Sequence, residues 1–208
     1  MDLALHLAGG CRRAIEWVAR IMATIAGWAY VGTAVFVTLD ALSRTFLGVS
    51  SGATTEISGY LLAFGISWSL AHGLAERAHI RVDLLVGKMP LWLRVWAHLA
   101  ALLLLLGLVA ILCWSATKVL GETMLFNARD LSALRIPLIW PQSLWAFGVF
   151  VLALFTAALT LEVVLLLAAR RPDEIETLMH AQSHQEEADE ARRALDEGKE
   201  KPREEDQP

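Results

Sequence analysis

The stretch WLRVWAHLAALLLLLGLVAILCWSAT, residues 92–117, decides the fold class of this chain. After Arg94 it contains no charged residue, and leucine and alanine dominate it. A helix needs about 20 residues to cross the roughly 30 Å hydrocarbon core of a bilayer, and it satisfies its own backbone hydrogen bonds while doing so. The stretch therefore predicts a transmembrane α-helix.

Three further apolar stretches lie on either side of it, at roughly 15–39, 57–75 and 141–169. None shows the strict alternation of a transmembrane β-strand. We expect an all-α integral membrane protein with four transmembrane helices in residues 15–170, preceded by a short N-terminal segment, 1–14, and followed by a charged tail, 171–208. The first apolar run is too long for the apolar part of a signal peptide, so we expect it to stay uncleaved.

The bulk composition agrees with a membrane protein that carries a polar tail. Of 208 residues, 56% are hydrophobic, and the mean hydropathy is +0.49, values that a soluble domain rarely reaches. Residues 1–172 hold 13 basic and 9 acidic side chains, whereas the remainder holds 5 basic and 13 acidic ones. We expect the acidic tail to be solvated and mobile, because it has too few apolar residues to bury a core.

Basic residues near the span ends predict the orientation. Nine of them flank the N-terminus, the segment between spans two and three, and the C-terminal end, against four on the opposite side. Because cytoplasmic loops are rich in Lys and Arg, we expect both termini in the cytoplasm of a bacterial cell, with the chain in the inner membrane. Residues 79–89 are too polar to span; they form either a short amphipathic segment at the cytoplasmic interface or an ordinary loop.

Small residues recur every four positions in span two, at Gly59, Ala63, Ser67 and Ala71. Such spacing lets a second helix approach closely inside a membrane. The second helix belongs either to this bundle or to a partner subunit. The leucine run at 102–106, by contrast, is expected to face lipid.

A few polar residues stand at the predicted outer ends of the spans. Asp40 and Arg44 are one helical turn apart and predict an ion pair. Glu56 falls in the first turn of span two, where an acid complements the helix dipole and a preceding threonine can cap the helix. Pro137 precedes span four, at a position where a helix tolerates proline. Structural roles or contacts with a partner explain all of them without catalysis.

Two histidines leave a cofactor alternative open. His72 near the end of span two and His98 near the start of span three are expected at similar depth on neighbouring helices, as in a haem-binding membrane cytochrome. Two histidines are a weak signal, and a Soret band would be required. No other pattern in the sequence indicates a cofactor, a metal site, a nucleophile with its base or a nucleic-acid partner.

Three elements together resemble one known family. They are Asp40 and Arg44 followed by TEIS at 55–58, HIRVDLL at 79–85, and SALRIP at 132–137 with aromatic and glycine residues after it. The order, spacing and number of spans over about 15–165 are similar to the small permease (Q) subunit of tripartite ATP-independent periplasmic (TRAP) transporters.

The resemblance implies a division of labour. In that family a soluble periplasmic protein captures an organic acid, typically a carboxylate, and a large M subunit moves it inward with a sodium gradient. The small subunit binds the large one and braces it without conducting substrate. The resemblance and the packing pattern together assign fold-defining or partner-contacting roles to Asp40, Arg44, Glu56, Gly59, Ala63, Ser67, His79, Arg81, Asp83 and Pro137.

Other function classes stay open on the sequence alone. A membrane cytochrome would require haem at His72 and His98. A small exporter or channel would transport when reconstituted alone, and it would need polar lining residues that these spans largely lack. A structural subunit of an unrelated complex would co-purify with a different partner.

Overall fold

The computed structural model describes residues 2–50, 52–76, 90–130 and 135–169, together with positions 171, 174, 175, 178 and 192. These residues form four long helices, α1 (Asp2–Leu47), α2 (Thr54–Ala75), α4 (Leu91–Phe126) and α5 (Ile139–Ala168). All four are long and apolar enough to cross a membrane. The prediction of an all-α chain with four such helices is confirmed. The proposed interfacial segment at 79–89 lies outside the described residues, as does most of the acidic tail.

In three of the helices, polar residues stand 20 positions apart with no charged residue between them. Arg20 and Asp40 in α1 are 20 positions apart, Glu56 and Glu76 at the two ends of α2 are 20 apart, and Gln142 and Glu162 in α5 are 20 apart. At 1.5 Å per residue each interval covers about 30 Å, the thickness of the hydrocarbon core. The three intervals hold no charged residue between their ends.

Two helices are much longer than the spans predicted for them. α1 has 46 residues and α4 has 36, whereas the predicted spans were 15–39 and 92–117. The first 18 residues of α1 therefore extend about 27 Å beyond Arg20. In α4 the charge-free stretch ends at Lys118, and the helix continues to Phe126.

The helix ends follow from backbone chemistry. α1 stops at Leu47, where Gly48 takes a positive φ of 67°, a conformation that glycine adopts without strain. Pro90 caps the start of α4 in an extended conformation. Asn127 ends α4 with left-handed geometry, and the N–H of Ala128 returns to the carbonyl of Thr123 at 3.0 Å.

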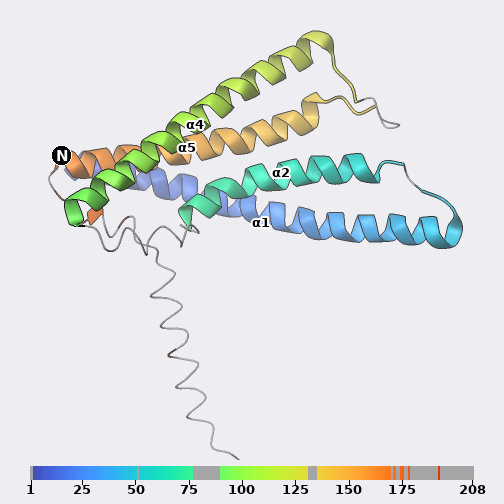
Figure 1. The fold of residues 1–208 in the computed structure, drawn as a ribbon, viewed down its shortest axis with the longest axis horizontal. Coiled ribbons are helices and arrows are strands. Elements are labelled where there is room, and N and C mark those ends of the chain that lie inside the picture. Colours follow the sequence, from blue (N-terminus) through green and yellow to red (C-terminus); the bar gives the residue numbers. More distant parts are fainter. Residues whose placement is uncertain are drawn as a thin grey trace, which may run out of the picture.

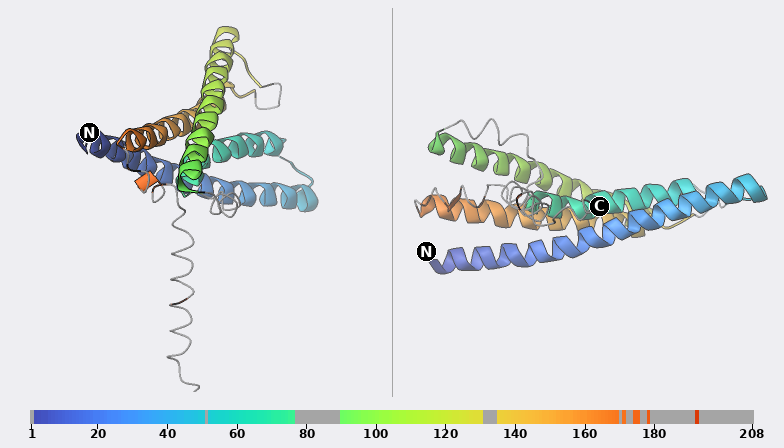
Figure 2. Two further views of the ribbon diagram at one scale, coloured as in Figure 1. Left: turned by 60° about the vertical axis from the view of Figure 1, so that its left-hand side comes forward. Right: turned by 90° about the horizontal axis from the view of Figure 1, so that it is seen from below.

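The helices form two hairpins that lie side by side (Figure 1). α1 packs against α2, and α4 packs against α5. The turns after α1 and α4 lie at one end of the molecule, and the start of α1 lies at the other. α4 diverges from α1 and α2 toward the end with the turns, as the first view of Figure 2 shows.

Helix α5 is the centre of the bundle. It contacts α1, α2 and α4, and in the second view of Figure 2 its second half, drawn in orange, lies between α4 and α1. Half of the residues in its most apolar segment are buried inside the protein, against 11–22% in the corresponding segments of the other helices. In lipid the outer helices can keep apolar side chains on their surfaces, so only the central helix has to be enclosed.

Two apolar clusters hold α5 in place. One joins Val95, Leu99 and Leu102 of α4 to the second half of α5. The other joins Ala19 and Met22 of α1 to α2, α4 and α5. Leu102 is buried and Leu105 packs against the second cluster, so the prediction that the run at 102–106 faces lipid is wrong for these two residues; Leu103 and Leu104 are exposed. Successive leucines point to different sides of a helix, which a contiguous run hides.

The first cluster also includes a residue from beyond α5. Ile175 is fully buried against it, and Leu178 packs on its edge. The N–H of Arg171 donates to the carbonyl of Leu166 at 3.1 Å, and Arg171 forms an ion pair with Glu174 at 2.5 Å. Apolar packing thus continues past position 171, where the sequence predicted the charged tail to begin.

Candidate functional site at the ends of the bundle

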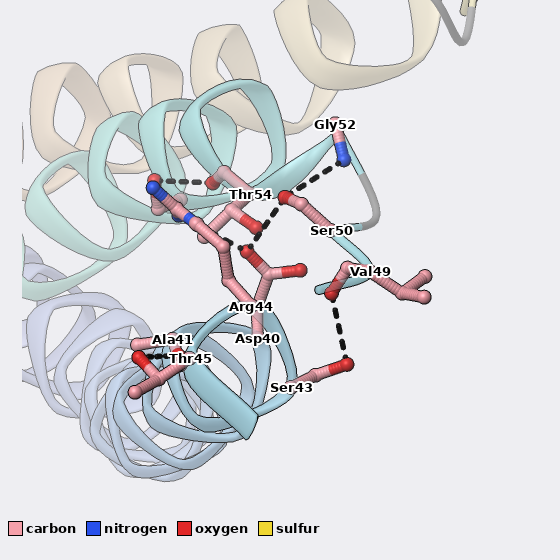
Figure 3. A network of polar contacts seen from close by, with 10 residues as sticks. Asp40, Ala41, Ser43, Arg44, Thr45, Val49, Ser50, Gly52 and Thr54 are labelled. Carbon is pink, nitrogen blue, oxygen red and sulfur yellow. Dashed lines mark hydrogen bonds and ion pairs between the residues drawn. The ribbon is translucent and has the colours of Figure 1, made fainter. Parts of the chain in front are cut away.

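A polar cluster closes the turn between α1 and α2 (Figure 3). Arg44 Nη2 lies 3.4 Å from Asp40 Oδ2, which confirms the predicted pair one helical turn apart. The Asp40 side chain is only 4% exposed, whereas that of Arg44 is 65% exposed. Ser50 Oγ donates a second hydrogen bond to Asp40 at 3.3 Å. The buried carboxylate therefore fixes the turn, and the cation stays accessible.

The backbone of the turn is tied down by its serines. Ser43 Oγ donates to the carbonyl of Val49 at 2.9 Å, and the N–H of Gly52 lies 3.5 Å from Ser50 Oγ. Gly52 takes a positive φ of 66°. Serine side chains thus satisfy backbone groups that no longer belong to either helix.

The start of α2 differs from its prediction in one respect. Glu56 lies in the first turn, as expected, but Ala53 is the N-cap residue and no side chain caps the helix. Thr54 is already helical, and its carbonyl accepts a hydrogen bond from Ser58 Oγ at 2.6 Å. Oε2 of Glu56 is shielded from solvent, and the described residues provide no hydrogen-bond partner for it.

A second polar contact joins α2 to the segment between α4 and α5. The hydroxyl of Tyr60, one turn after Glu56, donates to Asp130 Oδ2. The segment itself folds back through an isolated antiparallel bridge between Arg129 and Pro137, with the N–H of Asp130 on the carbonyl of Ile136 at 3.0 Å. Pro137 therefore sits at the base of this connection, immediately before α5.

The same end contains a shallow pocket of about 230 Å³ between α2 and α5. Nearby, Thr123 Oγ1 of α4 donates a hydrogen bond to Gln142 Oε1 of α5 at 2.6 Å. The side-chain oxygen of Gln142, the residue at the start of the charge-free interval in α5, therefore has a partner. The residues that line the pocket are Tyr60, Ala63, Leu138, Pro141, Gln142 and Trp145.

The small-residue stripe of α2 is divided between two environments. Ser67 and Ala71 are buried, and a Cβ added to Gly148 of α5 would lie 2.7 Å from the carbonyl oxygen of Ser67. Trp68 Nε1 donates to the carbonyl of Leu144 at 2.8 Å beside this crossing. Gly59 and Ala63 are exposed, and a Cβ on Gly59 would meet nothing within 4 Å. Half of the stripe is therefore used inside the bundle, and half is not.

The opposite end of the bundle holds an ion-pair cluster that the sequence reasoning missed. Arg12 Nε donates to Glu162 Oε2 at 2.6 Å, and Arg12 Nη1 lies 3.1 Å from Glu16 Oε2. The side chains of Arg12 and Glu162 are 18% and 13% exposed. One signal could have revealed it, since Glu162 is the only charged residue in the stretch 141–169 and such a carboxylate requires a partner.

The remaining predicted site residues have different outcomes. His79, Arg81 and Asp83 lie outside the described residues. His72 and His98 are on α2 and α4, which both pack against α5 and make no extensive contact with each other. Residues of both helices nevertheless belong to the second apolar cluster, through Ala71 and Val109, and the haem alternative stays a prediction. In the described ranges no group of three His, Cys, Asp or Glu side chains could hold a metal ion.

Comparisons with known proteins identify one family. The family described as "Tripartite ATP-independent periplasmic transporters, DctQ component" matches residues 33–166, from the middle of α1 to the last turn of α5. Neither the curated proteins nor the solved structures include a significant match. The matched range contains the Asp40 cluster, Tyr60, Asp130 and Glu162, but not Arg12. It covers well over half of the chain and describes a transporter component, not an enzyme. The chain therefore belongs to the DctQ component family of tripartite ATP-independent periplasmic transporters and is its small, multi-pass membrane subunit.

Proposed function

We propose that this subunit braces the large permease subunit of a sodium-coupled importer of organic acids and conducts no substrate itself. A soluble periplasmic protein delivers the carboxylate, and both termini of the small subunit lie in the cytoplasm of a bacterial cell. The observation that carries the proposal is the distribution of charge. In the described helices the 20-residue intervals across the hydrocarbon are charge-free, and Asp40 and Glu162 at their ends are engaged by arginines.

An ion or carboxylate pathway would require polar groups along its length. Charged side chains in the hydrocarbon are costly, and transporters keep them only where they serve the pathway. The interior contacts of this bundle are instead close packing of apolar and small residues, as in the two apolar clusters and at the crossing of Gly148 with Ser67. A rigid support needs such packing and no ion site.

Three residue groups are proposed to meet the large subunit or to shape the surface that does. Arg44 is exposed while its carboxylate partner is buried, so its guanidinium can also bind an acid on a partner. Gly59 and Ala63 leave room for a partner helix beside the pocket at Tyr60. His79, Arg81 and Asp83 belong to this proposal through the family motif alone.

The test separates support from conduction. Removal of the subunit from the intact transporter should abolish organic-acid uptake while the periplasmic protein still binds its ligand. Vesicles that contain only this subunit should show no uptake with a sodium gradient. Uptake by such vesicles, or normal uptake in cells without the subunit, would contradict the proposal.

A surface substitution tests the partner contact. Gly59→Leu and Ala63→Leu place bulk where a partner helix is expected, so both should reduce co-purification of the large subunit. Gly107→Leu on α4 is the matched control, because a Cβ there also meets nothing within 4 Å. Equal loss of co-purification in all three variants would argue against a contact at α2.

A further inference from the structure

One face of α1 changes from apolar to cationic at the edge of the hydrocarbon. Arg13, Trp17 and Arg20 are spaced by four and three positions, so they lie on one face of the helix. All three are exposed, and Trp17 is 64% exposed. Arg20 is the residue at the start of the charge-free interval in α1. Trp17 and Arg13 lie about 5 and 10 Å from Arg20 along the helix axis, on the side away from that interval.

The two arginines of this face are not neutralised by the described residues. Arg12, which points elsewhere, takes both nearby acids, Glu16 and Glu162. Arg13 Nε donates only to the carbonyl of Gly9, at 3.2 Å. Neither Arg13 nor Arg20 has an ion pair with any described carboxylate.

The same face continues through the hydrocarbon as exposed apolar surface. Trp28, Val31 and Val35 are 73%, 53% and 54% exposed, and their spacing keeps them in line with Arg20. From one end to the other, the face presents two cations, an aromatic ring between them and then an apolar strip. This order matches that of an anionic phospholipid, which has a charged headgroup followed by an acyl chain.

We propose that Arg13, Trp17 and Arg20 bind the phosphate headgroup of an anionic phospholipid, whose acyl chain lies along Trp28, Val31 and Val35. Guanidinium groups hold phosphate oxygens through paired, charge-assisted hydrogen bonds. The indole of Trp17 lies at the depth that tryptophan prefers in bilayers. A basic residue near an anionic membrane surface contributes about 1 kcal/mol, or about fivefold in affinity.

The structure favours lipid over a protein partner at this face. A protein contact would need no change from apolar to cationic at the hydrocarbon boundary, whereas a lipid requires the change at that depth. The lipid site is independent of the proposed bracing role, because it needs only the subunit and a membrane.

The experiment measures lipid binding to the purified full-length subunit in detergent. Titration with phosphatidylglycerol and phosphatidylcholine, followed by native mass spectrometry, should show preferential binding of the anionic lipid. Arg13→Gln and Arg20→Gln should each weaken phosphatidylglycerol binding about fivefold, and the double variant about 25-fold. Arg129→Gln removes an exposed arginine at the other end of the molecule and should change nothing.

Two further arms separate the alternatives. Inorganic phosphate should not displace phosphatidylglycerol; displacement at millimolar concentration would mean a free-anion site and overturn the lipid assignment. A photo-crosslinker at position 17 should capture lipid in native membranes, and capture of a protein there would overturn it in favour of a partner. Equal binding of both lipids, or binding unaffected in the double variant, would also overturn it. Unchanged thermal unfolding of the variants shows that they remain folded.

Discussion

Arg12 and Glu162 are 150 positions apart in the chain, yet Arg12 Nε lies 2.6 Å from Glu162 Oε2. The contact ties the extended start of α1 to the last turns of α5. Arg12 also reaches Glu16 on its own helix, so a single guanidinium serves two carboxylates. Because both partners are largely buried, the pair matters more to folding than an exposed surface ion pair would.

Breaking this pair from one side should destabilise the bundle. Glu162→Leu leaves the Arg12 guanidinium with only Glu16, and Arg12→Leu leaves a buried carboxylate without its donor. Each should lower the stability by about 1–3 kcal/mol. The change is measured as a lower midpoint of thermal unfolding in detergent. The double variant should recover part of the loss, since the buried Glu162 carboxylate is removed together with its donor and only Glu16 loses a partner. Additive losses would show that the two side chains do not interact.

Gly148 should tolerate no side chain. In Gly148→Ala the new Cβ would lie 2.7 Å from the carbonyl oxygen of Ser67, so α2 and α5 must move apart. Overpacking of this kind costs about 1–3 kcal/mol, and it should appear as a lower unfolding midpoint. Gly107→Ala is the control, because its Cβ meets nothing within 4 Å. That variant should be neutral or slightly stabilising.

The two members of the Asp40 pair should respond unequally to substitution. Asp40→Asn removes the charge from a side chain that is 4% exposed and that accepts hydrogen bonds from Ser50 and Arg44. Arg44→Gln changes a side chain that is 65% exposed. We expect Asp40→Asn to lower the unfolding midpoint more than Arg44→Gln does. Arg44→Gln should lower the free energy of unfolding by less than about 1 kcal/mol. If Arg44→Gln nevertheless reduces uptake by the intact transporter, the guanidinium serves a partner.

The hydroxyl of Tyr60 should contribute to the stability of the bundle. Tyr60→Phe keeps the ring and removes the hydrogen bond to Asp130 that joins α2 to the connection between α4 and α5. Tyr30→Phe is the comparison, because the Tyr30 hydroxyl donates to the backbone carbonyl of Leu62 at 3.3 Å. A carboxylate accepts stronger hydrogen bonds than a carbonyl, so Tyr60→Phe should lower the unfolding midpoint more. Equal effects of the two variants would contradict this reading.

The prediction of four helices long and apolar enough to cross a membrane is confirmed, because it needed only length and hydropathy. Residues 92–117 and 141–169 lie mostly inside α4 and α5, and Asp40 and Arg44 pair as their spacing required. The helix ends were less well predicted. α1 and α4 continue through polar residues such as Arg12 and Lys118, because a helix can extend into water or headgroups once its apolar part has formed.

The partners of the polar side chains could not be predicted. Glu162 finds Arg12, Tyr60 finds Asp130, and Gln142 finds Thr123, each across a long separation in the chain or between helices. Periodicity identifies which residues share a face of one helix, but not which face of another helix lies opposite. Ile175 illustrates the same point, since its burial against α5 depends on how the chain turns after the helix.

The sequence by itself determined that this chain forms four apolar helices and belongs among membrane subunits of a known transporter family, because backbone satisfaction in lipid leaves few alternatives to helices of this length. Only the tertiary structure decided that α5 is central, that half of the small-residue stripe on α2 packs within the bundle, and that Arg12 forms an ion pair with Glu162. The physical reason is that lipid accepts almost any apolar face of a helix. Which faces meet is set by close packing and by the pairing of a few polar groups.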